Sequence, residues 1–215
     1  MPQIFPRWVN EIPGRLQLSA ILLITLVILG FWYFGSPEYL ETGYAPNQPI
    51  PFSHTFHVTE LGIDCQYCHG GAWESAVAGI PSTQTCMTCH EYVGLEHETL
   101  QPLRDSWESG MPVEWIRVHD LPDHAYFNHS IHVNAGIGCV SCHGRVDRMD
   151  VVMKTESMSM GWCLDCHNNP APHLRPTSEI TNMAWEPPEN HMEFAQMLIE
   201  KRNIDASVYC NACHR

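Results

Sequence analysis

Every cysteine of the chain lies in one of five copies of the same short motif, Cys-x-x-Cys-His. The copies are Cys65-Cys68-His69, Cys86-Cys89-His90, Cys139-Cys142-His143, Cys163-Cys166-His167 and Cys210-Cys213-His214. This motif is the attachment signature of c-type haem, in which two thiols hold the porphyrin and the histidine gives the iron its proximal axial ligand. The pattern therefore predicts five covalently bound c-type haems.

Two other uses of ten cysteines explain less of the pattern. Disulfide bonds are common in exported proteins, but they do not require a histidine after every second cysteine. Structural zinc takes four ligands per ion, usually from two paired knuckles. Zinc therefore gives no reason for a histidine at the same offset five times.

The uncharged segment 16–35 predicts a single transmembrane helix. At about 1.5 Å per residue it is long enough to cross a hydrocarbon core about 30 Å thick. The aromatic cluster 31–34 is typical of a membrane interface. A cleaved signal peptide is the alternative, but its apolar region is shorter and ends in small residues, whereas this one ends in bulky aromatics.

The charges around this helix predict its orientation. Arg7 and Arg15 precede it, and the next basic residue is Arg104. The positive-inside rule then places residues 1–15 in the cytoplasm and residues 36–215 on the periplasmic side of a bacterial inner membrane. The net charge of −13 disfavours a nucleic-acid partner. The negative charge can attract a basic electron carrier, or it can simply keep the protein soluble.

Residues 36–215 form one predicted domain with an internal repeat at 52–90 and 127–167. Each copy reads Phe-x-His-x-x-His-Val, then Gly-Ile before one attachment motif, then a second motif. His54 precedes Cys65 by 11 residues, whereas His129 precedes Cys139 by 10. Such periodicity predicts two di-haem modules, with the fifth haem at 210–214.

Proline and glycine are scattered through this domain, where they break helices and exclude central strands. We therefore expect a haem-cored multihaem cytochrome c domain of mostly short helices and loops, with little or no sheet. One amphipathic helix is predicted over Glu189–Arg202.

The histidines outside the motifs are candidates for the second, distal axial ligand of each iron. The spacing His-x-x-His puts two rings on one turn, so that one turn can serve two haems. His54 is predicted to face the haem of the first motif and His129 that of the third. The predicted distal ligands are His54, His57, His119, His129 and His132.

The remaining histidines lie in polar, loop-like or proline-rich sequence, and we interpret them as non-ligands. They are His97, His124, His173 and His191. Methionine is a further ligand type, and it raises the haem potential relative to two histidines. Met149 and Met160 are possible distal ligands, although most methionines only fill apolar gaps.

Four longer strings are more specific than the attachment motif. They are Tyr44-Ala-Pro-Asn-Gln-Pro-Ile-Pro-Phe-Ser-His54, Ala76-Val-Ala-Gly-Ile-Pro-Ser-Thr83, Val118-His119-Asp-Leu-Pro-Asp123 with Tyr126-Phe-Asn-His129, and Ser159-Met160-Gly-Trp-Cys163-Leu-Asp-Cys-His167. On these strings the chain resembles the membrane-anchored pentahaem cytochrome c subunit of bacterial alternative complex III, a quinol-oxidising complex.

The resemblance implies an electron-transfer subunit with no catalytic residues of its own. Its partners would be multispanning quinol-site subunits, an iron–sulfur subunit and a further cytochrome c subunit. The acceptor would be a periplasmic cytochrome c or copper protein. The resemblance also supports His119 as a ligand and keeps Met149 and Met160 as candidates.

Two other functions are compatible with parts of the sequence. A free-standing membrane-anchored quinol dehydrogenase that feeds a periplasmic reductase has the same layout, but it fits the repeated modules and the 159–167 string less well. A catalytic multihaem reductase needs a five-coordinate haem beside acid–base residues. At least five candidate distal ligands argue against such an open haem.

Overall fold

The computed structural model describes residues 4–214. It divides into two compact units, the first ending at Glu41 and the second beginning at Thr42. In chain order the helices are η1 (Arg7–Glu11), α1 (Ile12–Phe34), α2 (Pro37–Glu41), η2 (Thr55–Glu60), α3 (Cys65–His69), α4 (Gly71–Glu74), α5 (Thr83–His90), η3 (Glu98–Leu100), α6 (Gln101–Ser109), α7 (His129–Ala135), α8 (Val140–His143), η4 (Val146–Arg148), α9 (Met160–Asn168), η5 (Ala171–His173), η6 (Thr177–Glu179), α10 (His191–Arg202) and α11 (Cys210–Cys213).

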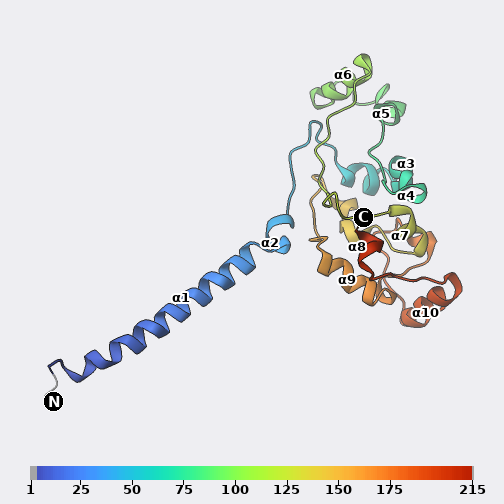
Figure 1. Cartoon of the computed structure of the whole chain (residues 1–215). Coiled ribbons are helices and arrows are strands. Elements are labelled where there is room, and N and C mark those ends of the chain that lie inside the picture. Colours follow the sequence, from blue (N-terminus) through green and yellow to red (C-terminus); the bar gives the residue numbers. More distant parts are fainter. Residues whose placement is uncertain (1–3, 215) are drawn as a thin grey trace. The chain divides into compact units, whose positions relative to one another are not determined.

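The fold class predicted from the sequence is confirmed. One apolar helix stands near the N-terminus, and short helices and loops make up the rest (Figure 1). Over residues 4–214 there is no strand, and only two isolated β-bridges occur, Ala125 with His214 and Ile137 with Leu174.

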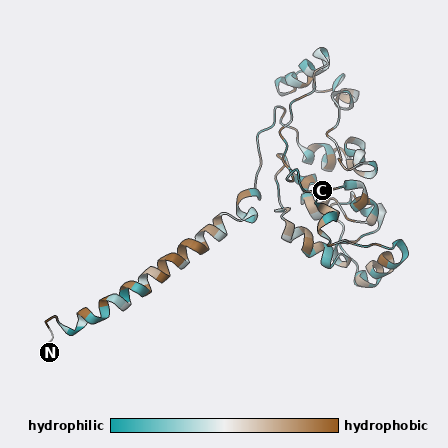
Figure 2. Ribbon diagram, in the orientation of Figure 1, coloured by the Kyte–Doolittle hydropathy of each residue, from teal (hydrophilic) through white to brown (hydrophobic). Residues whose placement is uncertain are grey.

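The first unit consists chiefly of α1, which is apolar around its whole circumference. None of its residues is buried, and Figure 2 shows its central turns as a hydrophobic band. The helix begins four residues before the predicted span, because Pro13 occupies the first turn, where its missing N–H costs nothing. Together with η1 it is long and apolar enough to cross a membrane.

The attachment motifs of the second unit lie on or directly before short helices, namely α3, α5, α8, α9 and α11. Three of these helices begin at a side chain that caps a backbone N–H. Asp64 accepts a hydrogen bond from Gln66, Ser82 from Thr85, and Ser159 from Trp162. The caps fix where each helix starts, and so they fix the direction in which the thiols and histidine of the motif project.

The apolar core of the second unit is small and divided. Buried apolar side chains form three clusters, centred on Ile50, Met87 and Leu103, on Ala72, Val133 and Ile180, and on Ala171, Leu174, Ala195 and Leu198. The last cluster joins α10 to η5. The amphipathic helix predicted at Glu189–Arg202 is therefore confirmed, with its start two residues later.

The two copies of the repeat differ by one residue, and the structure absorbs it in a π-helical turn. Module 1 (52–90) carries the π-helix η2 where module 2 (127–167) carries the α-helix α7. An inserted residue commonly widens an α-helical turn in this way, often at functional sites. The extra residue between His54 and Cys65 therefore leaves the two histidines of module 1 placed as they are in module 2.

Equivalent hydrogen bonds close both turns. The N–H of Ile63 donates to the carbonyl of His57 over 3.1 Å, and the N–H of Ile137 donates to that of His132 over 3.0 Å. Each bond spans a glycine with positive φ, +69° at Gly62 and +110° in module 2. The closing loops of the two copies thus end in the same way, although the loop of module 1 is one residue longer.

Candidate haem-binding centres

The ten cysteines, all within the described part of the chain, are free thiols. They are exposed or half-buried. Burial, followed by the thiols of Cys166 and Cys163, raises the pKa of Cys142 to about 12. Burial and the nearby Cys139 raise that of Cys65 to about 11. The motifs therefore present unpaired thiols, which are the groups that covalent haem attachment uses.

Four pairs of histidine rings are spaced for a metal ion between them. A metal–imidazole bond is about 2 Å long and the ring centre lies about 1 Å behind the nitrogen, so two opposed ligands have centres about 6 Å apart. Four pairs show this separation: His57–His90 at 6.2 Å, His129–His143 at 6.4 Å, His132–His167 at 6.0 Å and His124–His214 at 5.6 Å.

Backbone carbonyls hold most of these rings by one nitrogen. The Nδ1–H donates to a carbonyl in His57 (Ser53, 2.8 Å), His69 (Gly79, 2.8 Å), His90 (Val93, 3.2 Å), His129 (Ala76, 2.8 Å), His132 (Asn128, 2.8 Å), His167 (Ser207, 2.7 Å) and His214 (His124, 3.1 Å). Such a bond fixes the tautomer and leaves Nε2 with its lone pair as the metal ligand.

A phenylalanine fixes the second histidine of each turn. Phe52 stacks on His57 with ring centres 4.3 Å apart and an interplanar angle of 20°. Phe127 stacks on His132 at 4.5 Å and 29°. The repeated phenylalanine therefore holds the distal candidate of each module against rotation.

The histidine turn of each module is hydrogen-bonded to the other module. The backbone N–H of His54 donates to the carbonyl of Met149 over 3.0 Å, after the first attachment motif of module 2. The N–H of His129 donates to the carbonyl of Ala76 over 3.2 Å, after the first attachment motif of module 1. Each histidine turn thus rests on the loop of the other module.

His54 lies where the sequence predicts a distal ligand of the first motif. Its Nδ1 is buried without a hydrogen bond. Burial, then the neighbouring His69 and His57, lowers its pKa to about 4. A neutral ring beside His69 suits iron ligation, and the assignment stays a prediction.

His119 lies at the third motif. Its ring centre is 4.4 Å from that of His143, edge to face, and its Nε2 is buried without a hydrogen bond. Burial and then Lys154 lower its pKa to about 4. A separation of 4.4 Å is too short for these two rings to oppose each other across one iron.

The two methionine candidates differ in setting. Met149 is half-buried, and its carbonyl supports the His54 turn. Met160 begins α9 and is 66% exposed. Met158, which the sequence interpretation did not single out, has a φ of +51°, a strained value for a long side chain.

One residue of the four ring pairs was interpreted from the sequence as a non-ligand. His124 lies in a turn closed by the bond from Ala125 N–H to the carbonyl of Pro122, at 2.8 Å. The polar sequence around His124 does not indicate a ligand. Only its contact with His214, which is distant in the sequence, identifies it as a candidate. The sequence offered one weak signal, the nearby Tyr126–His129 string.

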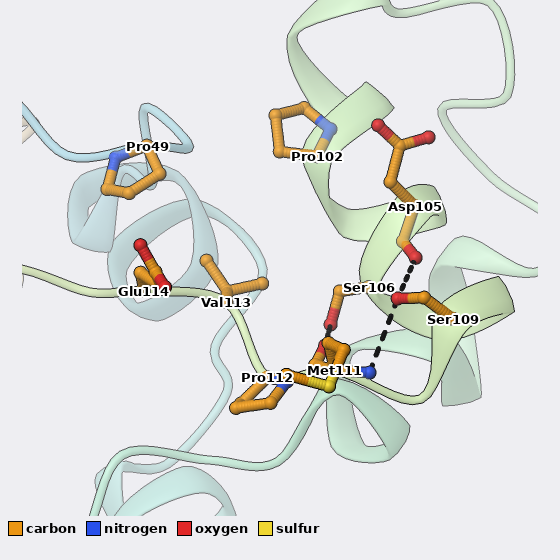
Figure 3. A pocket seen from close by; sticks show the side chains of 9 residues that line it. All are labelled: Pro49, Pro102, Asp105, Ser106, Ser109, Met111, Pro112, Val113 and Glu114. Carbon is orange, nitrogen blue, oxygen red and sulfur yellow. Dashed lines mark hydrogen bonds between the residues drawn. The ribbon is translucent and has the colours of Figure 1, made fainter.

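A shallow pocket of about 250 Å³ lies between Pro49 and α6 (Figure 3). Ser106 Oγ donates to the carbonyl of Met111 over 2.6 Å on its wall. None of its nine lining residues is a histidine or cysteine. The chemistry of the chain is therefore concentrated at the motifs.

These observations fit haem c. Free thiol pairs, carbonyl-anchored rings with available Nε2 atoms, and ring pairs about 6 Å apart are the arrangement that covalent, doubly ligated haem requires.

Comparison with known proteins agrees with this chemistry. Residues 131–215 match the family model described as cytochrome c3. The menaquinone reductase multihaem cytochrome c subunit of Nitratidesulfovibrio vulgaris is 34% identical over 122 residues, which cover 56% of this chain and 55% of that protein. The acrylate reductase cytochrome subunit of Shewanella woodyi is 23% identical over 112 residues, covering 52% and 69%.

The chain thus spans about half the length of the first of these relatives. Both relatives are named as cytochrome subunits of reductases. Residues 131–215, within the second unit, are thus similar to cytochrome c3, and this similarity agrees with haem c at the attachment motifs.

Proposed function

We propose that this chain is the pentahaem electron-transfer subunit of a membrane quinol-oxidising complex, of the alternative complex III type, and that it delivers electrons to a periplasmic acceptor. The observation that carries the proposal is the set of histidine pairs at the attachment motifs, whose ring centres lie about 6 Å apart. Similarity to a menaquinone reductase subunit supports a quinone-linked role, and the four specific strings support the type of complex.

Within each module, we assign the first histidine of the turn to the first motif and the second histidine to the second motif. His57 then opposes His90, and His132 opposes His167, as their ring separations of 6.2 and 6.0 Å support. His129 likewise opposes His143 at 6.4 Å. Haem c, when bound, supplies an iron that gains and loses one electron. The protein would hold most of these ligand rings through their Nδ1 hydrogen bonds, and two such imidazole ligands would keep the iron low-spin.

The order of the motifs in space supports a relay. Motifs 1 and 2 are joined by the hydrogen bond between Tyr67 Oη and Thr88 Oγ1, at 2.9 Å. Motifs 1 and 3 meet where Cys139 raises the pKa of Cys65, after burial.

Motifs 3, 4 and 5 are neighbours in the same way. After burial, the motif 4 thiols raise the pKa of Cys142 in motif 3, and Cys213 in motif 5 raises that of Cys163 in motif 4. The attachment motifs therefore follow one another in the order 2, 1, 3, 4, 5. In Figure 1 the helices α5, α3, α8 and α9 succeed one another along the second unit in this order.

Anchoring follows from α1, with residues 1–15 in the cytoplasm and the haem domain in the periplasm. Quinol chemistry needs a pocket between several membrane helices, and within residues 4–214 only one helix has the length and composition of a span. We therefore place the quinol site, and the catalysis, in partner subunits. These would include multispanning subunits, an iron–sulfur subunit and a further cytochrome c.

The acidic charge of −13 suits a basic soluble acceptor, such as a cytochrome c or a copper protein. Electron transfer to such an acceptor should slow as ionic strength rises, because salt screens the attraction. A rate that does not change with salt would exclude this kind of partner.

In a second candidate function, the haems carry electrons toward quinone, or from quinol to a periplasmic reductase. The names of the two relatives favour this function. In that case the chain would work in a reductase or as a free-standing quinol dehydrogenase.

The test is a native gel of mildly solubilised membranes, stained for haem, with every polypeptide of the haem band identified. We expect a large band that also contains iron–sulfur and multispanning subunits, and haems that a menaquinol analogue reduces anaerobically. A small band holding this chain alone would refute the complex. A large band containing a dedicated terminal reductase would favour the second candidate.

A further inference from the structure

We propose that His124 is the distal axial ligand of the fifth haem, the one attached at Cys210 and Cys213. The inference rests on the proposed function in two respects, that the fifth motif carries haem and that the histidines of the two modules serve the four other motifs. Motif 5 has no histidine turn of its own, and module 1 and module 2 use theirs on the four other motifs. Its distal ligand must therefore come from elsewhere in the chain.

The ring geometry of His124 and His214 matches that of the other pairs. Their centres are 5.6 Å apart and their planes 24° apart. That separation is 0.4 Å less than the 6.0 Å of His132 and His167. The Nδ1–H of His214 donates to the carbonyl of His124 over 3.1 Å, so its Nε2 is left as the ligand atom.

The backbone brings this pair together across a long sequence distance. Ala125 and His214 form an antiparallel bridge. The N–H of Tyr126 donates to the carbonyl of Cys213 over 2.6 Å. The C-terminal motif is therefore tied to the segment just before module 2, and both rings are fixed by the same backbone contact.

His119, the fifth distal ligand predicted from the sequence, is placed differently. It is five residues before His124, on the other side of the Pro122 turn, and its ring contacts His143 of motif 3. His191, another histidine of the C-terminal region, uses its Nε2 in a bond with the carbonyl of Pro172, at 3.3 Å. His124 is thus the histidine that the fold assigns to motif 5.

The assignment gives the fifth centre a distinct character. Both His124 and His214 are exposed, whereas the rings of His57, His129 and His132 are half-buried. The exposed histidine pair of motif 5 is therefore a centre that a soluble redox partner can approach.

The test uses the full-length chain, matured with its haems and purified in detergent, as wild type, His124→Ala and His124→Met. For His124→Ala we expect an unchanged haem content by pyridine haemochrome assay, because attachment depends on the thiols. One of the five haems should become high-spin by electron paramagnetic resonance and bind carbon monoxide when reduced. Added imidazole should restore the low-spin state.

His119→Ala is the matched control, and it should leave the fifth haem low-spin. His124→Met should keep all haems low-spin and raise one midpoint potential, since thioether ligation favours the reduced iron. The proposal fails if His124→Ala leaves every haem low-spin, or if His124→Met shifts no potential. It also fails if His119→Ala alone opens the fifth haem.

These outcomes do not depend on the complex. A chain that runs alone on the native gel would refute the proposed function and leave the His124 assignment intact. A wild-type chain that lacks haem at motif 5 would refute both the proposed pentahaem function and the His124 assignment.

Discussion

Replacing Gly136 by alanine should destabilise the second unit strongly, whereas the same change at Gly62 should cost little. The two glycines occupy equivalent positions in the two modules, each closing a histidine turn. Gly62 has a φ of +69° and open space around an added Cβ. At Gly136, φ is +110° and an added Cβ would lie 2.7 Å from the carbonyl oxygen of Arg175.

The magnitude follows from these differences. A left-handed φ costs an alanine about 1 kcal/mol, and this is the whole expected effect at Gly62. At Gly136, φ lies outside the left-handed well, which costs roughly 1–3 kcal/mol. Relieving the contact with the Arg175 carbonyl oxygen also strains two backbone hydrogen bonds. They run from Gly136 N–H to the carbonyl of His132 and from Arg175 N–H to the carbonyl of Gly136, and each contributes about 1 kcal/mol. We expect a total of about 3–5 kcal/mol.

The assay is urea unfolding of the full-length haem-loaded chain in detergent, followed by far-ultraviolet circular dichroism and by the Soret band. Gly62→Ala is the matched control, because it changes the same residue type in the same turn. The measured quantity is the free energy of unfolding of each variant relative to wild type. Equal losses in the two variants would refute the argument from the Arg175 contact.

Leu174→Ala should cost about 3 kcal/mol in the same assay, because this side chain is fully buried between η5 and α10 and its removal leaves a cavity; a loss below 1 kcal/mol would contradict that packing. Ser159→Ala removes the cap of α9 and should cost about 1 kcal/mol, whereas Ser159→Asp should retain most of the stability. The hydrogen bond from Arg145 holds the pKa of Asp147 below its ordinary value of 3.8, so the pair stabilises the fold above pH 3.8 and this stability is lost as pH falls through the folded-state pKa. Asp147→Asn should therefore cost about 1 kcal/mol or less at pH 7 and nothing in strong acid, and a difference that does not change with pH would exclude this mechanism.

Much of the fold was predictable because its signals are local. The attachment motifs and the apolar run of α1 are each recognised from a few neighbouring residues. The prediction of short helices without a sheet follows from proline and glycine placement, and it is confirmed. The amphipathic pattern over Glu189–Arg202 was also enough to predict helix α10.

The pairing of rings was less predictable because it depends on distant parts of the chain. His124 and His214 meet only through the bridge at Ala125, and nothing near either residue indicates it. The difference between spacings of 11 and 10 residues was visible in the sequence, but its consequence, the π-helix η2, needed the backbone. The sequence made His119 a candidate distal ligand without indicating which motif it lies beside, because its contact with His143 is likewise long-range.

The hydrogen bonds that join each histidine turn to the other module bear on how the protein matures. The turn at His54 rests on the carbonyl of Met149, which is synthesised long after the first two attachment motifs. Contacts between residues so far apart in the sequence form slowly, and until they form the N-terminal histidine turn is not fixed in place. The machinery that attaches haem would therefore meet Cys65 and Cys86 while their distal histidines are still mobile, and the first module would close around its cofactors only when the second arrives.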